Sequence, residues 1–169
     1  MGGVRGGKEA LISVYTGQNV GAGKLDRVHD GVKHGLKLAL SFSVTITIIL
    51  VLFGKILFGF FTNTPELIEL AIKMMRVLAV GYICVSVTQI LGGIMRGCGD
   101  TVTPMWISMI QTIVIRVPLA YLLAYLTKSA EYPHGAPIAL FGSMLISWVL
   151  GMIMSIIAFR SGKWKRKLL

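Results

Sequence analysis

Charged residues are scarce in this chain, and acidic residues are scarcer still. Of its 169 residues only 14% are charged, with 7 Asp and Glu against 17 Lys and Arg, whereas 54% are hydrophobic. About a quarter of the residues in a soluble globular domain are charged. Long uncharged stretches are unstable against water, so the composition argues against a soluble enzyme and points to a membrane protein.

Groups with the chemistry of a catalytic or metal site are also missing. The 3 His residues are scattered along the sequence, and the 2 Cys form no ligand set with them. The glycine-rich segment 17–24 has Gln18 where a phosphate-binding loop needs its first glycine, and Leu25 where it needs Ser or Thr. The sequence therefore predicts no metal, no cofactor and no enzymatic activity.

Four apolar runs are each long enough to cross a membrane. About 20 apolar residues in a helix span the hydrocarbon core, and the short alternating segments of a β-barrel are absent. Proline after a capping residue predicts helix starts at Pro65 and Pro104, and Pro137 opens the last run. The predicted fold class is all-α, a polytopic membrane helical bundle with four transmembrane helices plus the end of a preceding helix. The predicted helices are residues 38–61, 65–95, 104–126 and 137–159.

The chain is expected to divide into three parts. The first apolar run, residues 10–15, is too short for the core of a signal peptide and is interpreted as the end of a truncated helix. Residues 1–37 would then hold this helix end and a cytoplasmic Gly-rich loop. The four-helix membrane region would occupy residues 38–160, followed by a basic cytoplasmic tail at residues 161–169.

The basic residues are distributed unevenly between the two sides of the predicted bundle. One side carries ten Lys and Arg: Lys24, Arg27, Lys33, Lys37, Arg96, Arg160, Lys163, Lys165, Arg166 and Lys167. The other side carries four: Lys55, Lys73, Arg76 and Lys128. The positive-inside rule then puts both chain ends in the cytoplasm, with the protein in the plasma or inner membrane. Topology explains the basic excess, so no nucleic-acid partner is expected, and residues 163–167 are predicted to anchor at the surface of anionic lipid.

Polar and small residues line one face of the second predicted helix. Tyr82, Ser86, Gln89 and Gly93 are spaced by four, three and four residues, which places them together on a helix. Two interpretations stay open. These groups can hydrogen-bond to neighbouring helices, or they can line a cavity and bind a ligand.

Arg116 lies near the middle of the third predicted helix. An arginine there costs roughly 2.5 to 3.5 kcal/mol on insertion scales, so it should face protein or water. Ser108 and Thr112 share its face, with Gln111 beside them, and Pro118 is expected to kink the helix. The alternatives are a cavity residue that tunes a substrate or proton site, and a structural arginine that caps carbonyls or pairs with an acid elsewhere. The cavity candidates are Tyr82, Ser86, Gln89, Gln111, Arg116 and Tyr121.

The fourth predicted helix carries small residues at strict four-residue spacing. This spacing lets helix backbones approach closely and predicts a packing seam. The seam consists of Ala139, Ser143, Ser147, Gly151 and Ser155.

Two motifs, "TGQNVGAGKLDRV" and "MRGCGDTVTPM", lie on either side of the first two predicted spans. In this order and spacing the chain resembles the multidrug and toxic compound extrusion (MATE) family, over roughly residues 9–160. The resemblance implies the end of helix eight and helices nine to twelve, in the second lobe of a twelve-helix transporter. Its motif residues are expected to form connections or hinges: Gly17, Gln18, Gly21, Gly23, Arg96, Gly97, Gly99, Asp100, Thr101 and Pro104.

The resemblance implies an efflux antiporter that works by alternating access and is driven by protons or sodium. The family's sodium-coupled branch has an Asp where this sequence has Ser86. No acid lies in the apolar segments 38–61, 77–95, 105–126 and 137–159, so the ion site is expected outside this chain. The implied partners are the lipid bilayer, a small-molecule substrate, and a missing N-terminal lobe or a partner chain. The alternative is a transport-inactive fragment, or a helical membrane module that acts only with a partner chain.

The predicted topology can be tested with reporter fusions. Green fluorescent protein fused after Leu169 should fluoresce, because it would stay in the cytoplasm. Alkaline phosphatase inserted after Lys128 should be active, because that loop would lie outside. Active phosphatase fused after Leu169 would contradict the orientation.

Overall fold

The computed structural model describes residues 3–129, 132–162 and 164, and every regular element within them is helical. In chain order the elements are α1 (Gly3–Gly21), α2 (Leu25–Gly59), α3 (Pro65–Gly97), α4 (Val102–Met109), a π-helical segment (Ile110–Ile115), α5 (Arg116–Leu126) and α6 (Pro137–Arg160). Four helical stretches are long and apolar enough to cross a membrane, with α4, the π-helical segment and α5 forming one of them. The predicted all-α membrane bundle is therefore confirmed.

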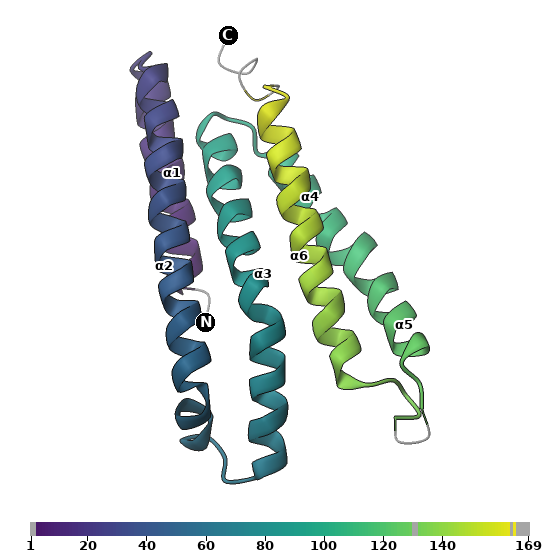
Figure 1. Cartoon of the computed structure of the whole chain (residues 1–169). Helices are drawn as coiled ribbons and strands as arrows, with labels where there is room; N and C mark the ends of the chain where they lie inside the picture. The colour runs from purple at the N-terminus through teal and green to yellow at the C-terminus, as the bar shows by residue number, and fades with distance from the viewer. Residues whose placement is uncertain (1–2, 130–131, 163, 165–169) are drawn as a thin grey trace.

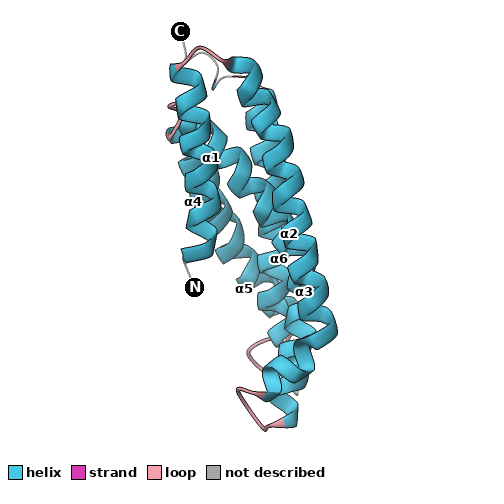
Figure 2. Cartoon of the chain, turned by 90° about the vertical axis from the view of Figure 1, so that its left-hand side faces the viewer, coloured by secondary structure: helices cyan, strands magenta, loops and turns pink. Residues whose placement is uncertain are grey.

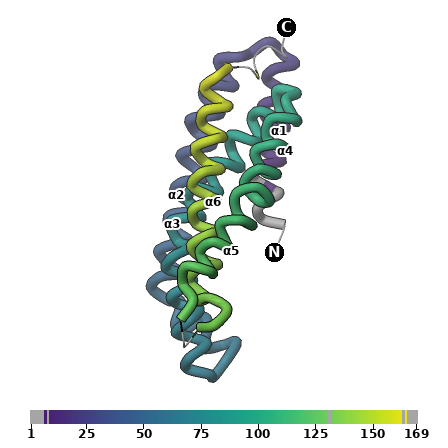
Figure 3. Tube along the Cα trace, turned by 90° about the vertical axis from the view of Figure 1, so that its right-hand side faces the viewer, coloured from purple at the N-terminus to yellow at the C-terminus, as the bar shows by residue number. Residues whose placement is uncertain are grey.

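The helices run alternately up and down a single elongated bundle (Figures 1 and 2). The connections at residues 22–24 and 98–101 and the end of α6 lie together at the top of Figure 1, here called the glycine-loop end. The connections at residues 60–64, 127–129 and 132–136 lie at the opposite end. From another side, α4, the π-helical segment and α5 follow one continuous path beside α6 (Figure 3).

The Gly-rich loop is much shorter than the predicted boundaries suggested. Only residues 22–24 separate α1 from α2, and Gly23 there has a φ of +69°, a conformation that favours glycine. The helix then starts at Leu25 rather than near residue 38, because three apolar side chains at four-residue spacing pack into the core: Val28, Val32 and Leu36. With 35 residues, α2 is about 52 Å long, so it extends well beyond a hydrocarbon core of about 30 Å.

The buried residues of the glycine-loop end include Trp164, which was expected to belong to a lipid-surface anchor. Its side chain is 2% exposed, its indole N–H donates to the carbonyl of Phe159 at 2.8 Å, and the two rings stack 5.1 Å apart. Gly162, with a φ of +68°, turns the chain back over the end of α6. Trp164 therefore packs in the protein core, while Lys163 and residues 165–169 lie outside the described residues.

Cys98 packs in the same core cluster, just after the end of α3. Burial, with a smaller contribution from the charge of Asp100, raises the pKa of the Cys98 thiol to about 11. The thiol therefore stays protonated at neutral pH and behaves as a small apolar group.

Two glycines of α3 bring α1 unusually close. A Cβ atom on Gly93 would lie 3.0 Å from the carbonyl oxygen of Glu9, and one on Gly97 would lie 2.5 Å from the carbonyl oxygen of Ser13. Glycines four residues apart allow helix backbones to approach in this way within membranes. Gly97, expected to supply a flexible connection, instead ends α3 at a tight helix contact.

Substituting Gly97→Ala should lower the free energy of unfolding by about 1–3 kcal/mol, because the added methyl group meets the backbone of α1 rather than a movable side chain. Thermal unfolding in detergent would measure the loss. Gly21→Ala is the matched control, because nothing lies within 4 Å of a Cβ atom at that position. Equal melting temperatures for both variants would contradict the close contact.

Candidate functional site

A polar cavity of about 340 Å³ lies between α1, α3, α6 and the α4–α5 path. Its walls include three of the predicted cavity residues, Gln89, Gln111 and Arg116, and two of the motif residues, Arg96 and Pro104. The predicted polar face of the third helix, formed by Ser108 of α4 and Thr112 of the π-helical segment, also opens into it. The third predicted helix therefore does turn its polar side toward an internal space.

Arg116 is held in the cavity wall by α6. Its Nε donates to the Oγ of Ser147 at 3.3 Å, and its guanidinium carbon lies 5.9 Å from the ring centroid of Trp148. Ser147 in turn donates to the carbonyl of Met144 at 2.9 Å. A guanidinium has five N–H donors, and within the described part of the chain only the one on Nε is used. The other four N–H donors are therefore available to an acceptor in the cavity.

The small-residue seam of α6 makes this arrangement possible. All five of its residues are buried, which confirms the predicted seam: Ala139, Ser143, Ser147, Gly151 and Ser155. Gly151 accommodates the side chain of Gln111, which would collide with a Cβ atom there. Because Gly151 and Ser147 are small, Gln111 and Arg116 pack against the backbone of α6 without leaving the cavity.

The π-helical segment sets which side chains of the third span share a face. In it, backbone N–H groups bond five residues back, and the N–H of Arg116 donates to the carbonyl of Gln111. Gln111 and Arg116, five residues apart, therefore lie above one another, opposite Gly151 and Ser147, which are four residues apart. Pro118, expected to kink this helix, is the third residue of α5, close after the π-helical segment, and has no N–H to donate.

An ion pair between α1 and α3 forms the wall of the cavity nearest the glycine-loop end. Arg96 Nη2 contacts Glu9 Oε1, with side-chain exposures of 35% and 22%. Gly92 leaves room for the guanidinium to fold back along α3, since a Cβ atom there would lie 3.1 Å from Arg96 Nη2. Arg96 therefore pairs with Glu9, and Asp100 instead accepts the N–H of Thr103 at 3.3 Å at the start of α4. Sequence reasoning missed Glu9, because no local pattern links the two helices.

Tyr82 and Ser86 line a second, mainly apolar cavity of about 190 Å³ between α2 and α3. Ser86 donates to Ser43 at 3.0 Å, and Ser43 donates to the carbonyl of Tyr82 at 3.2 Å. These two candidates thus take part in helix-to-helix hydrogen bonds. Gln89 belongs to the walls of both cavities.

Tyr121 lies apart from the other candidates. It is 76% exposed on α5 and is in the wall of neither cavity. The structure therefore brings together Gln89, Gln111 and Arg116, and adds Glu9 and Arg96 to them. Among the described residues, no group of three or more His, Cys, Asp or Glu is placed to hold a metal ion.

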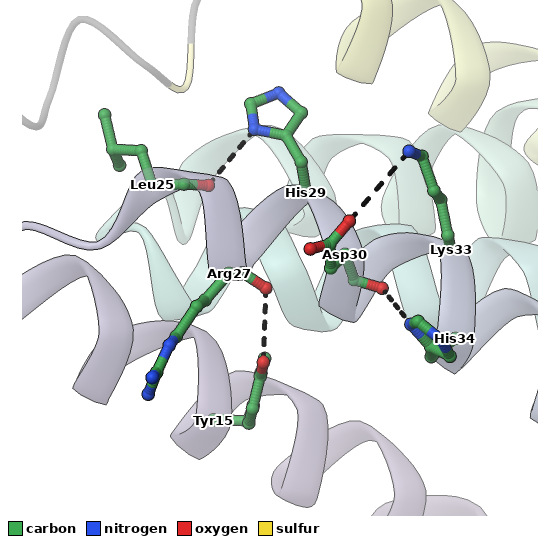
Figure 4. Close-up of polar contacts among 7 residues, drawn as sticks. All are labelled: Tyr15, Leu25, Arg27, His29, Asp30, Lys33 and His34. Atoms are coloured by element: carbon green, nitrogen blue, oxygen red, sulfur yellow. Dashed lines mark hydrogen bonds and ion pairs between the residues drawn. The ribbon is translucent and has the colours of Figure 1, made fainter.

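The two glycine-containing motifs, far apart in sequence, meet at the glycine-loop end. A Cβ atom on Gly17 would lie 3.4 Å from the carbonyl oxygen of Gly97. Beside this contact, Tyr15 donates to the carbonyl of Arg27 at 3.2 Å and joins α1 to α2 (Figure 4). Gln18 and Gly21 lie in the last turns of α1, Gly23 is in the turn that follows, and Gly99, with a φ of +86°, makes the turn before Thr101 and α4. Their role as hinges stays a prediction.

Comparison with known proteins places these observations in a family. The family model described as MatE matches residues 10–122. The chain is 26% identical over 161 residues to the probable multidrug resistance protein NorM of Thermotoga maritima, covering 95% of this chain and 33% of that protein. It is 24% identical over 117 residues to the probable multidrug resistance protein YoeA of Bacillus subtilis, covering 69% of this chain and 25% of that protein.

A solved structure shows the same fold. It is described as the inward-facing conformation of a multidrug resistance MATE family transporter of the MOP superfamily. The TM-score is 0.71 at 16% sequence identity, and the match covers 94% of this chain and 36% of that chain. The chain thus spans about a third of the length of these relatives, or less.

The contribution of the ion pair can be measured with a double-mutant cycle on Glu9→Gln and Arg96→Gln. We expect a coupling free energy of roughly 0.5–3 kcal/mol, because both partners are largely removed from water. Unfolding in detergent would provide the four stabilities. The exposed Lys73–Glu69 pair on α3, 2.9 Å apart, is the control and should couple much more weakly, because water screens both charges. A coupling no larger than that of the control would mean that the ion pair does not hold α1 to α3.

Proposed function

The chain belongs to the MatE family, and from this premise we propose that it contributes the helices of one lobe to an efflux transporter for small molecules. The polar cavity around Arg116 is the observation that carries the proposal. A costly intramembrane charge, facing an internal space and leaving four donors unused, is suited to binding rather than to packing alone. The protein is a multi-pass membrane protein, and we place it in the cell membrane with both ends in the cytoplasm.

The proposed mechanism is alternating access. One lobe rocks against the other around a central site, and ligand or ion binding biases the two states. The tight contacts of α1 with α3 through Gly93 and Gly97 support rigid-body motion of this lobe, since such contacts deform little. The second lobe would come from further sequence of the same protein or from a partner chain.

The export is proposed to be coupled to protons or sodium as an antiport. A coupling site needs a carboxylate that is free to bind and release the cation. Glu9 is the acid in the polar cavity among the described residues, and it is engaged by Arg96. We therefore place the coupling carboxylate in the part of the transporter outside this chain.

A second candidate function is a helical module that transports nothing by itself and acts only by packing against a partner chain. The exposed faces of the bundle favour it. In the most apolar 18-residue stretch of α2, and likewise of the α4–α5 span, only 11% of the residues are buried within the bundle. These faces suit further helices as well as lipid.

Export of a fluorescent substrate from cells that express the complete transporter would separate these functions. We expect export that stops when the proton and sodium gradients are collapsed, and a rate at least about tenfold lower for Arg116→Ala, because the variant removes the central donor of the cavity. Arg160→Ala, at the exposed end of α6, is the charge-matched control and should export normally. Normal export by Arg116→Ala at equal expression would overturn the role of the cavity. No export by any version would favour the packing module.

A further inference from the structure

The polar cavity carries more positive than negative charge. The charged side chains in its described wall are Glu9, Arg96 and Arg116, which together leave one positive charge. Glu9 and Arg96 neutralise each other through their ion pair. Among the described wall residues, the charge that remains unbalanced is therefore that of Arg116.

Within the described part of the chain, the contacts of the Arg116 guanidinium are with two neutral groups. Ser147 accepts a hydrogen bond from its Nε, and the face of Trp148 lies beneath it, but neither group cancels a positive charge. A guanidinium inside a membrane bundle is stable when an anion or water meets its free donors. The two oxygens of a carboxylate match the parallel N–H bonds of a guanidinium, and its single charge equals that of Arg116.

The walls beside Arg116 supply both further donors and an apolar surface. The side-chain amides of Gln89 and Gln111 make no hydrogen bond within the described chain, and each has two N–H donors. Ile107 and Trp148 cover another part of the wall with apolar groups. The cavity volume of about 340 Å³ falls within the range of small-molecule sites.

We propose that this cavity binds small organic anions, with the carboxylate on Arg116 and Gln111 and an apolar or aromatic body against Trp148. If the proposed export function holds, on which this part of the inference rests, such carboxylates are cargo of the transporter. The Glu9–Arg96 ion pair contributes to this preference for anions. Glu9 pairs with Arg96, so Arg116 is the cation without an acidic partner among the described residues of the cavity wall.

Binding of three probes of similar size and different charge tests the proposal. The protein is reconstituted in lipid nanodiscs, and calorimetry compares benzoate, benzamide and benzylammonium without any ion gradient. Benzoate should bind at least tenfold more tightly than benzylammonium, with benzamide between them. Preference for benzylammonium, or equal binding of all three probes, would overturn the proposal.

Variants assign the binding to the cavity. Arg116→Gln should weaken benzoate at least tenfold and leave benzamide nearly unchanged, while Arg160→Gln removes the same charge outside the cavity and should have no effect. Glu9→Gln should tighten benzoate binding several-fold, because it releases Arg96 as a second cation. If Arg116→Gln does not fold, Glu9→Gln decides alone, and unchanged or weaker benzoate binding in it would overturn the proposal.

The binding experiment is independent of transport. Benzoate binding in a protein that exports nothing would overturn the proposed function and leave the anion site standing. Export of cationic dyes by a protein that fails to bind benzoate would overturn the anion site alone.

Discussion

The cost of a guanidinium in the middle of a membrane span is the constraint that organises this bundle. Arg116 needs polar neighbours, and α6 supplies one in Ser147, the middle residue of a seam of small residues. The same seam admits Gln111 over Gly151. A cavity remains because these side chains occupy the gap between α3, α6 and the third span without filling it. The cavity thus lies where the charge of Arg116 meets the small residues of α6.

The helix α1 closes this cavity toward the glycine-loop end. Gly93 and Gly97 let its backbone approach α3, and this approach brings Glu9 within reach of Arg96. Close packing and charge pairing therefore occur in the same contact between α1 and α3. The same pair of helices brings the two glycine-containing motifs together, because Gly17 of the first motif packs against Gly97 of the second.

The sequence predicted the four spans, their starts at Pro65 and Pro137, and the small-residue seam, because length, hydropathy and periodicity are local properties. It misplaced the start of α2, where glycines and charges concealed an amphipathic helix. The prediction that Trp164 anchors the tail at the lipid surface was wrong for a similar reason. A Trp among lysines is typical of a lipid anchor, but the turn at Gly162 folds Trp164 onto Phe159.

The candidate site shows where prediction from local pattern ends. Gln89, Gln111 and Arg116 were identifiable because polar groups in an apolar helix must face something other than lipid. Helical spacing could not show that Tyr121 is exposed and lies outside the cavity, or that Glu9 lies in its wall. Both positions depend on how helices distant in sequence pack together. The sequence by itself determined that the chain forms membrane helices and that Gln89, Gln111 and Arg116 need polar surroundings. Only the tertiary structure decided which of these residues share a cavity and which cation in it is neutralised, because charge pairing depends on distances across helices that no local pattern encodes.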